Sequence, residues 1–107
     1  MSAPLPADRV LDALGNPVRR QIVVLLAQGP RAVGALAAEF PISRPAVSKH
    51  LRLLEGAGLV RHRAAGTANV FELDQAGFLV ARRWLDDFWR EGLADFKALA
   101  EATWEPS

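Results

Sequence analysis

The stretch from residue 40 to residue 60 constrains the fold most, because it carries start and stop signals for one helix. Ser43 is a residue type that caps helix N-termini, and Pro45 falls in the first helical turn, where a missing N–H is tolerated. Gly58 stands where a glycine commonly ends a helix. The apolar positions follow the spacing of one buried helical stripe: Val47, Leu51 and Leu54. The stretch therefore predicts a helix with one apolar side.

The opposite side of this helix is short, polar and basic. It presents Pro45, Ser48, Lys49 and Arg52. An alanine-rich helix is expected just before it, over residues 32–39, with a tight turn at residues 40–42. A helix with an apolar back and a basic front, introduced by such a turn, is typical of the second helix of a helix-turn-helix. Residues 32–58 therefore predict that motif.

Two further helices are expected before the motif. Residues 7–14 predict a short helix, and residues 17–28 predict a second one, capped by Asn16 and opened by Pro17. Arg19 and Arg20 are expected to point outward from the second helix. Residues 1–6 contain two prolines and are expected to form a flexible arm.

A hairpin is expected after the motif. The extended segments at residues 59–65 and 68–73 flank Gly66 and Thr67, a plausible two-residue turn. Arg61 and Arg63 alternate outward, whereas the second strand turns its apolar side chains, Phe71 and Leu73, inward. A basic hairpin directly after a basic helix is typical of a wing that reaches DNA phosphates. The alternative is an ordinary surface hairpin with solvated arginines.

The last element is predicted to be one helix over residues 75–103, capped by Asp74 and roughly 40 Å long. An apolar stripe runs along it, which a small domain cannot cover over its whole length. We expect this stripe to form a dimer interface together with Leu11 of the first helix. The members of the stripe are Phe78, Ala81, Leu85, Phe88, Trp89, Gly92, Phe96 and Leu99. Two alternatives stay open. The helix could fold back on its own domain, or Trp84, Phe88 and Trp89 could line a groove for an apolar small-molecule effector.

Length and composition limit the remaining classes of protein. The 107 residues predict one domain, and no apolar run approaches the roughly 18 residues that span a membrane. The first residues lack a signal-peptide pattern, so a cytoplasmic protein is expected. With no cysteine, disulfides and thiolate metal sites are excluded. Residues 1–70 contain nine Lys and Arg and four Asp and Glu, whereas residues 71–107 contain four Lys and Arg and eight Asp and Glu. This separation of charge favours a protein whose basic half binds a polyanion.

The sequence offers no pattern for catalysis, for a cofactor or for a metal. His50 and His62 lie in different elements without a third ligand, so His50 is expected at the edge of the core and His62 on the surface. Asp86 and Asp87 are neighbours on a helix and point about 100° apart, so they do not converge on one substrate atom. No glycine-rich phosphate loop is present. We expect neither an enzyme nor a bound cofactor.

Residues 14–22 (LGNPVRRQI) and 42–60 (ISRPAVSKHLRLLEGAGLV) resemble the ArsR-type winged helix-turn-helix repressors, and the resemblance extends over about residues 8–100. It implies a mainly α fold with a small β-hairpin, in the order α-α-α-α-β-β-α, and a long C-terminal dimerisation helix. It also implies a homodimer that represses transcription at an inverted-repeat operator in double-stranded DNA. The positions expected to meet DNA are Ser43, Arg44, Pro45, Ser48, Lys49, Arg52, Arg61, Arg63 and Thr67.

The chain departs from the metal-sensing members of this family. Those members carry cysteines in the first helix of the motif, or carboxylate and histidine ligands on the terminal helix. Residues 33–38 offer no ligand here, and residues 74–107 contain no histidine. The resemblance therefore implies a repressor that does not sense metal. The competing hypothesis is a winged-helix module that dimerises or binds a partner protein without reading DNA.

Overall fold

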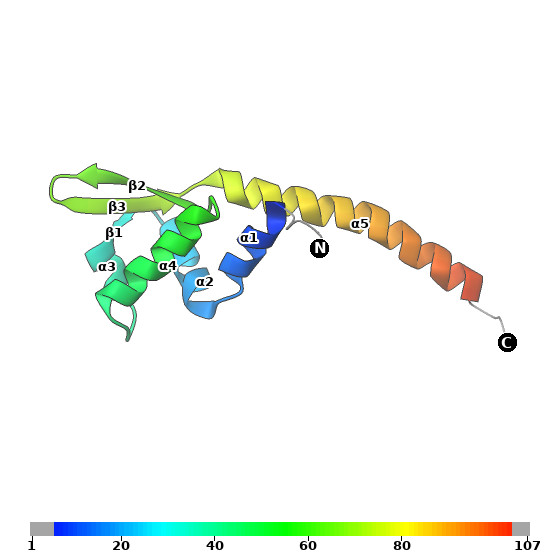
Figure 1. Ribbon diagram of the computed structural model, residues 1–107, viewed down its shortest axis with the longest axis horizontal. Coiled ribbons are helices and arrows are strands. Elements are labelled where there is room, and N and C mark those ends of the chain that lie inside the picture. The colour runs from blue at the N-terminus through cyan, green and yellow to red at the C-terminus, as the bar shows by residue number, and fades with distance from the viewer. Residues whose placement is uncertain (1–5, 104–107) are drawn as a thin grey trace, which may run out of the picture.

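The structure is a computed structural model, and it describes residues 6–103. Eight elements follow one another along the chain (Figure 1): α1 (Pro6–Leu14), α2 (Pro17–Ala27), β1 (Arg31–Ala32), α3 (Val33–Ala37), α4 (Arg44–Gly56), β2 (Val60–Ala65), β3 (Ala68–Leu73) and α5 (Gln75–Thr103). The mainly helical winged helix-turn-helix expected from the sequence is confirmed, and so are the bounds of its last helix. Of the expected flexible arm, residues 1–5 lie outside the described part, and Pro6 belongs to α1.

The sheet has three strands rather than the two of the expected hairpin. β2 and β3 pair antiparallel from Val60↔Leu73 to Ala65↔Ala68, around a turn in which Gly66 has φ +63°. β1 adds a short third strand beside β3, through the pairs Arg31↔Phe71 and Ala32↔Val70. The helix expected over residues 32–39 is correspondingly shorter, because Ala32 belongs to β1 and the helix ends at Ala37. A two-residue strand is too short to show a period in the sequence.

The helix caps expected from the sequence are confirmed. The Asn16 side chain accepts hydrogen bonds from the backbone N–H groups of Val18 and Arg19 at 2.8 and 3.2 Å. The Ser43 hydroxyl accepts one from Ala46 N–H at 3.2 Å. At the start of α5, Asp74 Oδ1 accepts from Ala76 N–H at 3.0 Å. These caps set where α2, α4 and α5 begin.

The core lies where α1, α2, α3 and α4 meet the base of the sheet. The apolar stripe of α4 is fully buried in it, together with residues from each neighbouring element: Val10, Ile22, Leu26, Leu36, Val47, Leu51, Leu54, Leu59 and Val60. Phe40 and Ile42 of the turn pack against this cluster. Figure 1 shows that α5 covers the core only with its first turns and then runs away from the body. The molecule is therefore elongated, with extents of 68 × 30 × 27 Å.

Within residues 6–103, no helix has the length and apolar character needed to cross a membrane.

The first turn of α5 is fixed to the end of α4 by two glycines. Gly58 has φ +75°, a left-handed conformation that favours glycine at a helix C-terminus. Its carbonyl accepts a hydrogen bond from Gly77 N–H at 2.7 Å. A Cβ placed on Gly77 would lie 2.5 Å from Ala57 O and 2.8 Å from Gly58 O. Only glycine therefore allows this approach of the two backbones.

Arg19 does not point outward as expected from the sequence. Its Nε donates to Ala13 O at 2.7 Å and its Nη2 donates to Asp12 O at 3.2 Å, which satisfies carbonyls at the end of α1. Arg20 is exposed as expected, although its Nη1 donates to Leu14 O at 2.8 Å. The expectation for Arg19 failed because the carbonyls it meets belong to another helix.

Candidate nucleic-acid interface

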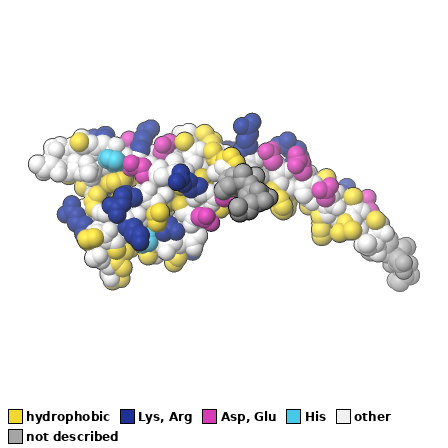
Figure 2. Space-filling view, viewed as in Figure 1, with side chains coloured by type: hydrophobic (Ala, Val, Ile, Leu, Met, Phe, Trp, Pro, Cys, Tyr) yellow, Lys and Arg dark blue, Asp and Glu magenta, His cyan; other side chains and the backbone are white. Residues whose placement is uncertain are grey.

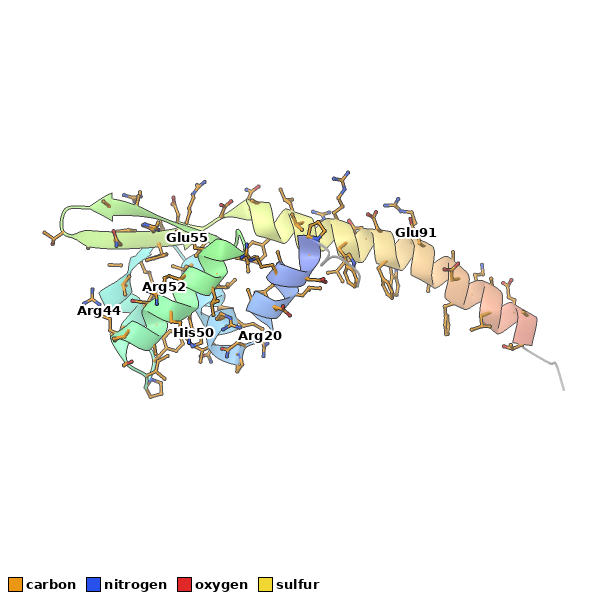
Figure 3. The ribbon with its side chains drawn as sticks, viewed as in Figure 1. Arg20, Arg44, His50, Arg52, Glu55 and Glu91 are labelled. Atoms are coloured by element: carbon orange, nitrogen blue, oxygen red, sulfur yellow. The ribbon has the colours of Figure 1, made fainter. Side chains whose placement is uncertain are left out.

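The exposed side of α4 carries most of the expected DNA contacts. Ser43, Arg44, Pro45, Lys49 and Arg52 are exposed, and Ser48 is half-buried. Figure 3 shows Arg44 near the N-terminal end of α4 and Arg52 further along the same helix. Because the opposite side of α4 is packed into the core, the basic side is held outward in one orientation.

The Arg44 side chain lies close to α3, the first helix of the motif. A Cβ placed on Gly34 would lie 3.6 Å from Arg44 Nη1, so the guanidinium has this glycine as its neighbour. No ion pair involves Arg44, Lys49 or Arg52 within residues 6–103. Their charges are therefore free to meet an anion.

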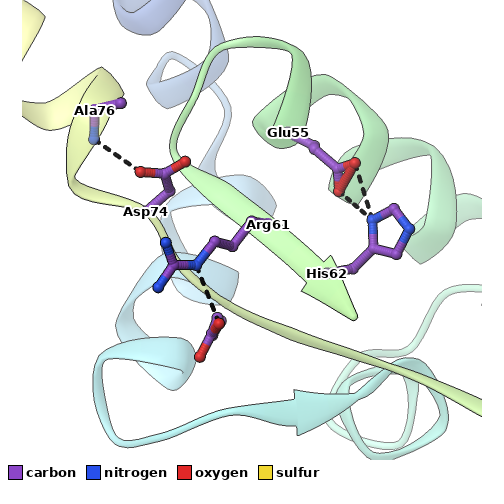
Figure 4. Close-up of polar contacts among 6 residues, drawn as sticks. Glu55, Arg61, His62, Asp74 and Ala76 are labelled. Atoms are coloured by element: carbon purple, nitrogen blue, oxygen red, sulfur yellow. Dashed lines mark hydrogen bonds and ion pairs between the residues drawn. The ribbon is translucent and has the colours of Figure 1, made fainter. Parts of the chain in front are cut away.

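The hairpin of β2 and β3 projects beyond the core as a wing. Val60 is buried at its base, whereas residues 61–69, which include Arg61, Arg63 and Thr67, are exposed. Arg61 Nε forms an ion pair with Glu72 Oε1 at 3.0 Å across the two strands (Figure 4). Arg63 has no such pair in the described part of the chain. Of the two wing arginines, Arg63 therefore offers the charge that is not already compensated.

A hydrogen-bonded contact links α4 to the wing. His62 Nδ1 of β2 lies 2.9 Å from Glu55 Oε1 and 2.5 Å from Glu55 Oε2 (Figure 4). The His62 ring also lies 5.2 Å from the Phe71 ring of β3, measured between centroids. Sequence reasoning placed His62 only on the surface, because a contact between a helix and a strand leaves no periodic signal. The contact orients the wing relative to α4.

His50 lies at the edge of the core and contacts a second basic residue. Arg19 Nη1 lies 3.3 Å from His50 Nδ1, and since a guanidinium only donates, this ring nitrogen is the acceptor. The pKa of His50 is lowered from its usual value, first by burial and then by the nearby charges of Arg19 and Lys49. The ring is therefore held neutral in the folded chain at neutral pH.

The lowered pKa of His50 predicts a loss of stability in mild acid. Below about pH 6.5 the unfolded chain binds a proton at this histidine more readily than the folded chain does, so the free energy of unfolding falls as the pH drops. Urea unfolding of the wild type and of His50→Gln between pH 7.5 and pH 5 measures this. We expect the wild type to lose more stability than the variant, whose amide can still accept from Arg19. Parallel curves would contradict this role of His50.

The charges of the molecule are separated along its length. On the face in Figure 2, Lys and Arg side chains gather over α4 and its surroundings, whereas Asp and Glu recur along α5. Clustered positive charge raises both the association rate and the binding affinity for a polyanion. The basic end is the one that carries α4 and the wing.

The apolar stripe of α5 divides into two parts. Ala81 is buried in the core and Phe78 packs against it, so this chain already covers these two. Gly92 is half-buried, with the Phe88 ring 3.3 Å from the place where a Cβ would stand. The remaining members of the expected interface are exposed, by 38 to 67%: Leu11, Leu85, Phe88, Trp89, Phe96 and Leu99.

The aromatic residues considered for an apolar effector line different hollows. Trp84 stacks on Phe88 with 5.5 Å between ring centroids, and it lines a hollow of about 290 Å³ beside the start of α1. Trp89 lines a separate hollow further along α5.

Comparison with known proteins finds one family and several relatives. The family described as "Bacterial regulatory protein, arsR family" matches residues 16–62. The HTH-type transcriptional regulator Rv2034 of Mycobacterium tuberculosis is 46% identical over 102 residues, 95% of each chain. The transcriptional repressor SdpR of Bacillus subtilis is 29% identical over 79% of this chain and 94% of its own. The homodimeric winged helix-turn-helix DNA-binding domain Mb0332 from Mycobacterium bovis has a TM-score of 0.63 and 34% identity, over 94% of this chain and 88% of that chain.

Proposed function

Since this chain belongs to the arsR family of bacterial regulatory proteins, we propose that it is a homodimeric repressor that binds an inverted-repeat operator. It is a transcriptional regulator with a winged helix-turn-helix DNA-binding domain. The observation that carries the proposal is the basic, exposed side of α4, which continues into a projecting wing. A repressor among the relatives and a homodimer among the solved structures support it.

In the proposed complex, α4 enters the major groove and the wing reaches the adjoining backbone. Arg44 and Arg52 are the proposed base-reading side chains, because a guanidinium can donate two parallel hydrogen bonds to guanine. Lys49, Arg63 and the tip residue Thr67 are proposed to contact phosphates, as is Arg61 after exchanging Glu72 for a phosphate. Ser43, Pro45 and Ser48 complete the surface at the start of α4.

The proposed dimer is formed by α5 together with α1. The exposed apolar side chains of α5 form a continuous stripe beyond the part covered by the core. A two-fold dimer requires two half-sites about one helical turn of DNA apart, or a multiple of it. The operator is therefore proposed to be an inverted repeat.

The proposed signal is not a metal bound through cysteines, since the chain contains none. An apolar effector beside Trp84 stays a subordinate hypothesis. As a regulator of transcription, the protein is proposed to act in the cytoplasm, where bacterial DNA is found.

Replacing the two base-reading arginines tests the proposal. If Arg44 and Arg52 each donate two hydrogen bonds to a guanine, the loss of either side chain weakens operator binding by about 1–3 kcal/mol and reduces the base preference at one position of the operator. We therefore expect Arg44→Ala with Arg52→Ala to reduce both affinity and sequence preference in fluorescence anisotropy. Arg63→Ala is the matched control, because loss of a phosphate contact weakens all sequences alike and lowers the salt slope by about one.

Equal binding by the wild type and the double variant would refute the assignment of α4 as the recognition helix. Dimerisation without any DNA binding would instead favour a winged-helix module that contacts another protein.

A further inference from the structure

A hollow of about 280 Å³ lies between α1 and the C-terminal half of α4. Three arginines line it: Arg9 of α1, Arg19 of α2 and Arg52 of α4. Within residues 6–103, the single carboxylate that lines it is Asp12, and the other lining residues apart from the arginines are uncharged. The charges of the lining therefore leave a surplus of two positive charges, because His50 beside Arg19 is held neutral.

The guanidinium of Arg19 is fixed in place before any ligand arrives. Two carbonyls at the end of α1 and the ring of His50 hold it through three contacts of 2.7–3.3 Å. A guanidinium carries five N–H donors, so these contacts leave two for a ligand. Because the side chain is already ordered, binding an anion there costs little conformational entropy.

Arg9 and Arg52 approach the same hollow from different helices. Both side chains are exposed, and neither belongs to an ion pair within residues 6–103. Guanidinium groups that line one hollow suit the oxygens of a phosphate group, which accept bidentate hydrogen bonds. The surplus of two positive charges exceeds the single negative charge of a phosphodiester and matches the nearly double charge of free phosphate.

The hollow is continuous with the DNA-facing side of α4, because Arg52 belongs to both. In the proposed complex α4 occupies a DNA groove. The DNA backbone that borders this groove on the side of α1 would then lie beside Arg9 and Arg19. Neither residue belongs to the recognition helix or to the wing.

We propose that Arg9 and Arg19 form an oxyanion seat for a phosphate group, to which Arg52 contributes when it is not bound to guanine. The phosphate comes either from the DNA backbone beside the operator groove or from a free phosphate-type anion. The first source rests on the proposed DNA-binding function, whereas the second does not.

The test uses the full chain, Arg9→Gln and a matched control, Arg83→Gln, which removes the same charge from an exposed position on α5. In the first arm, fluorescence anisotropy measures binding to duplex DNA from upstream of the gene across a salt series. If the seat takes a backbone phosphate, Arg9→Gln weakens binding about fivefold or more and lowers the salt slope by about one, whereas Arg83→Gln matches the wild type.

In the second arm, inorganic phosphate is titrated against chloride at equal ionic strength while amide NMR shifts are recorded. If the seat takes free phosphate, shifts at Ala13 and Gly56, which line the hollow, saturate in the wild type and in Arg83→Gln but not in Arg9→Gln. Either arm alone supports the seat and identifies its source.

The proposal is overturned if Arg9→Gln behaves like the wild type in both arms. If the wild type binds no DNA at all, the proposed function fails, but the phosphate titration still decides whether the seat exists.

Discussion

Replacing Gly77 with alanine is expected to lower the free energy of unfolding by about 2 kcal/mol, because a Cβ there would lie closer to its neighbours than at any other glycine of the chain. The added Cβ would lie 2.5 Å from Ala57 O and within 3 Å of the Gly58 carbonyl. Both neighbours are backbone atoms at the end of α4, so no side chain can rotate away. Overpacking of this kind costs about 1–3 kcal/mol.

The substitution also separates α5 from α4. The hydrogen bond from Gly77 N–H to Gly58 O, 2.7 Å long, would lengthen, at a net cost of about 1 kcal/mol. The better helix propensity of alanine offsets at most about 1 kcal/mol of the total. Urea denaturation followed by circular dichroism measures the difference.

Gly56→Ala is the matched control, because Gly56 is also helical and has no atom within 4 Å of the place where its Cβ would stand. It is expected to leave stability unchanged or to raise it by up to about 1 kcal/mol. Equal stability of the two variants would contradict the contact between α4 and α5.

Replacing Phe88 and Phe96 with serine is expected to convert the proposed dimer into folded monomers. These side chains are 57% and 67% exposed in the single chain, so the monomer core does not depend on them. Each buried phenylalanine contributes roughly 1.5–3 kcal/mol, and a dimer would hold four. Sedimentation equilibrium should show the loss of the dimer, while the circular dichroism spectrum stays helical.

The same double variant is expected to bind operator DNA at least about 100-fold more weakly, because one chain then holds one half-site without the effective concentration that its partner supplies. Arg90→Ser with Lys97→Ser changes two exposed polar positions on the same helix and should remain dimeric. A wild type that is monomeric at high concentration, or a serine variant that stays dimeric, would contradict the role given to α5.

Local signals explain why much of the fold could be predicted from the sequence. Asn16, Ser43 and Asp74 mark three helix starts through caps that involve only neighbouring residues. The bounds of α5 followed from its cap and its continuous apolar stripe. The hairpin followed from alternation around Gly66, which has a positive φ. The residues that produce each of these signals are neighbours in the sequence, so a single segment is enough to predict the element.

The features that sequence reasoning missed depend on contacts between distant segments. Arg19 turns inward because the carbonyls of α1 lie beside it, and Gly77 is required because the backbone that follows α4 lies against the first turn of α5. The contact between Glu55 and His62 joins a helix to a strand, and Arg9 and Arg52 line one hollow only because α1 packs on α4. None of these pairs has a spacing that a periodic pattern can reveal.

Fluorescence anisotropy of the wild-type chain tests the central claim most directly, using a duplex from upstream of its own gene beside a scrambled duplex of equal composition. We expect tighter binding to the upstream duplex, two chains per site and an affinity that falls steeply with salt. Absence of binding to either duplex, even at low salt, would contradict it.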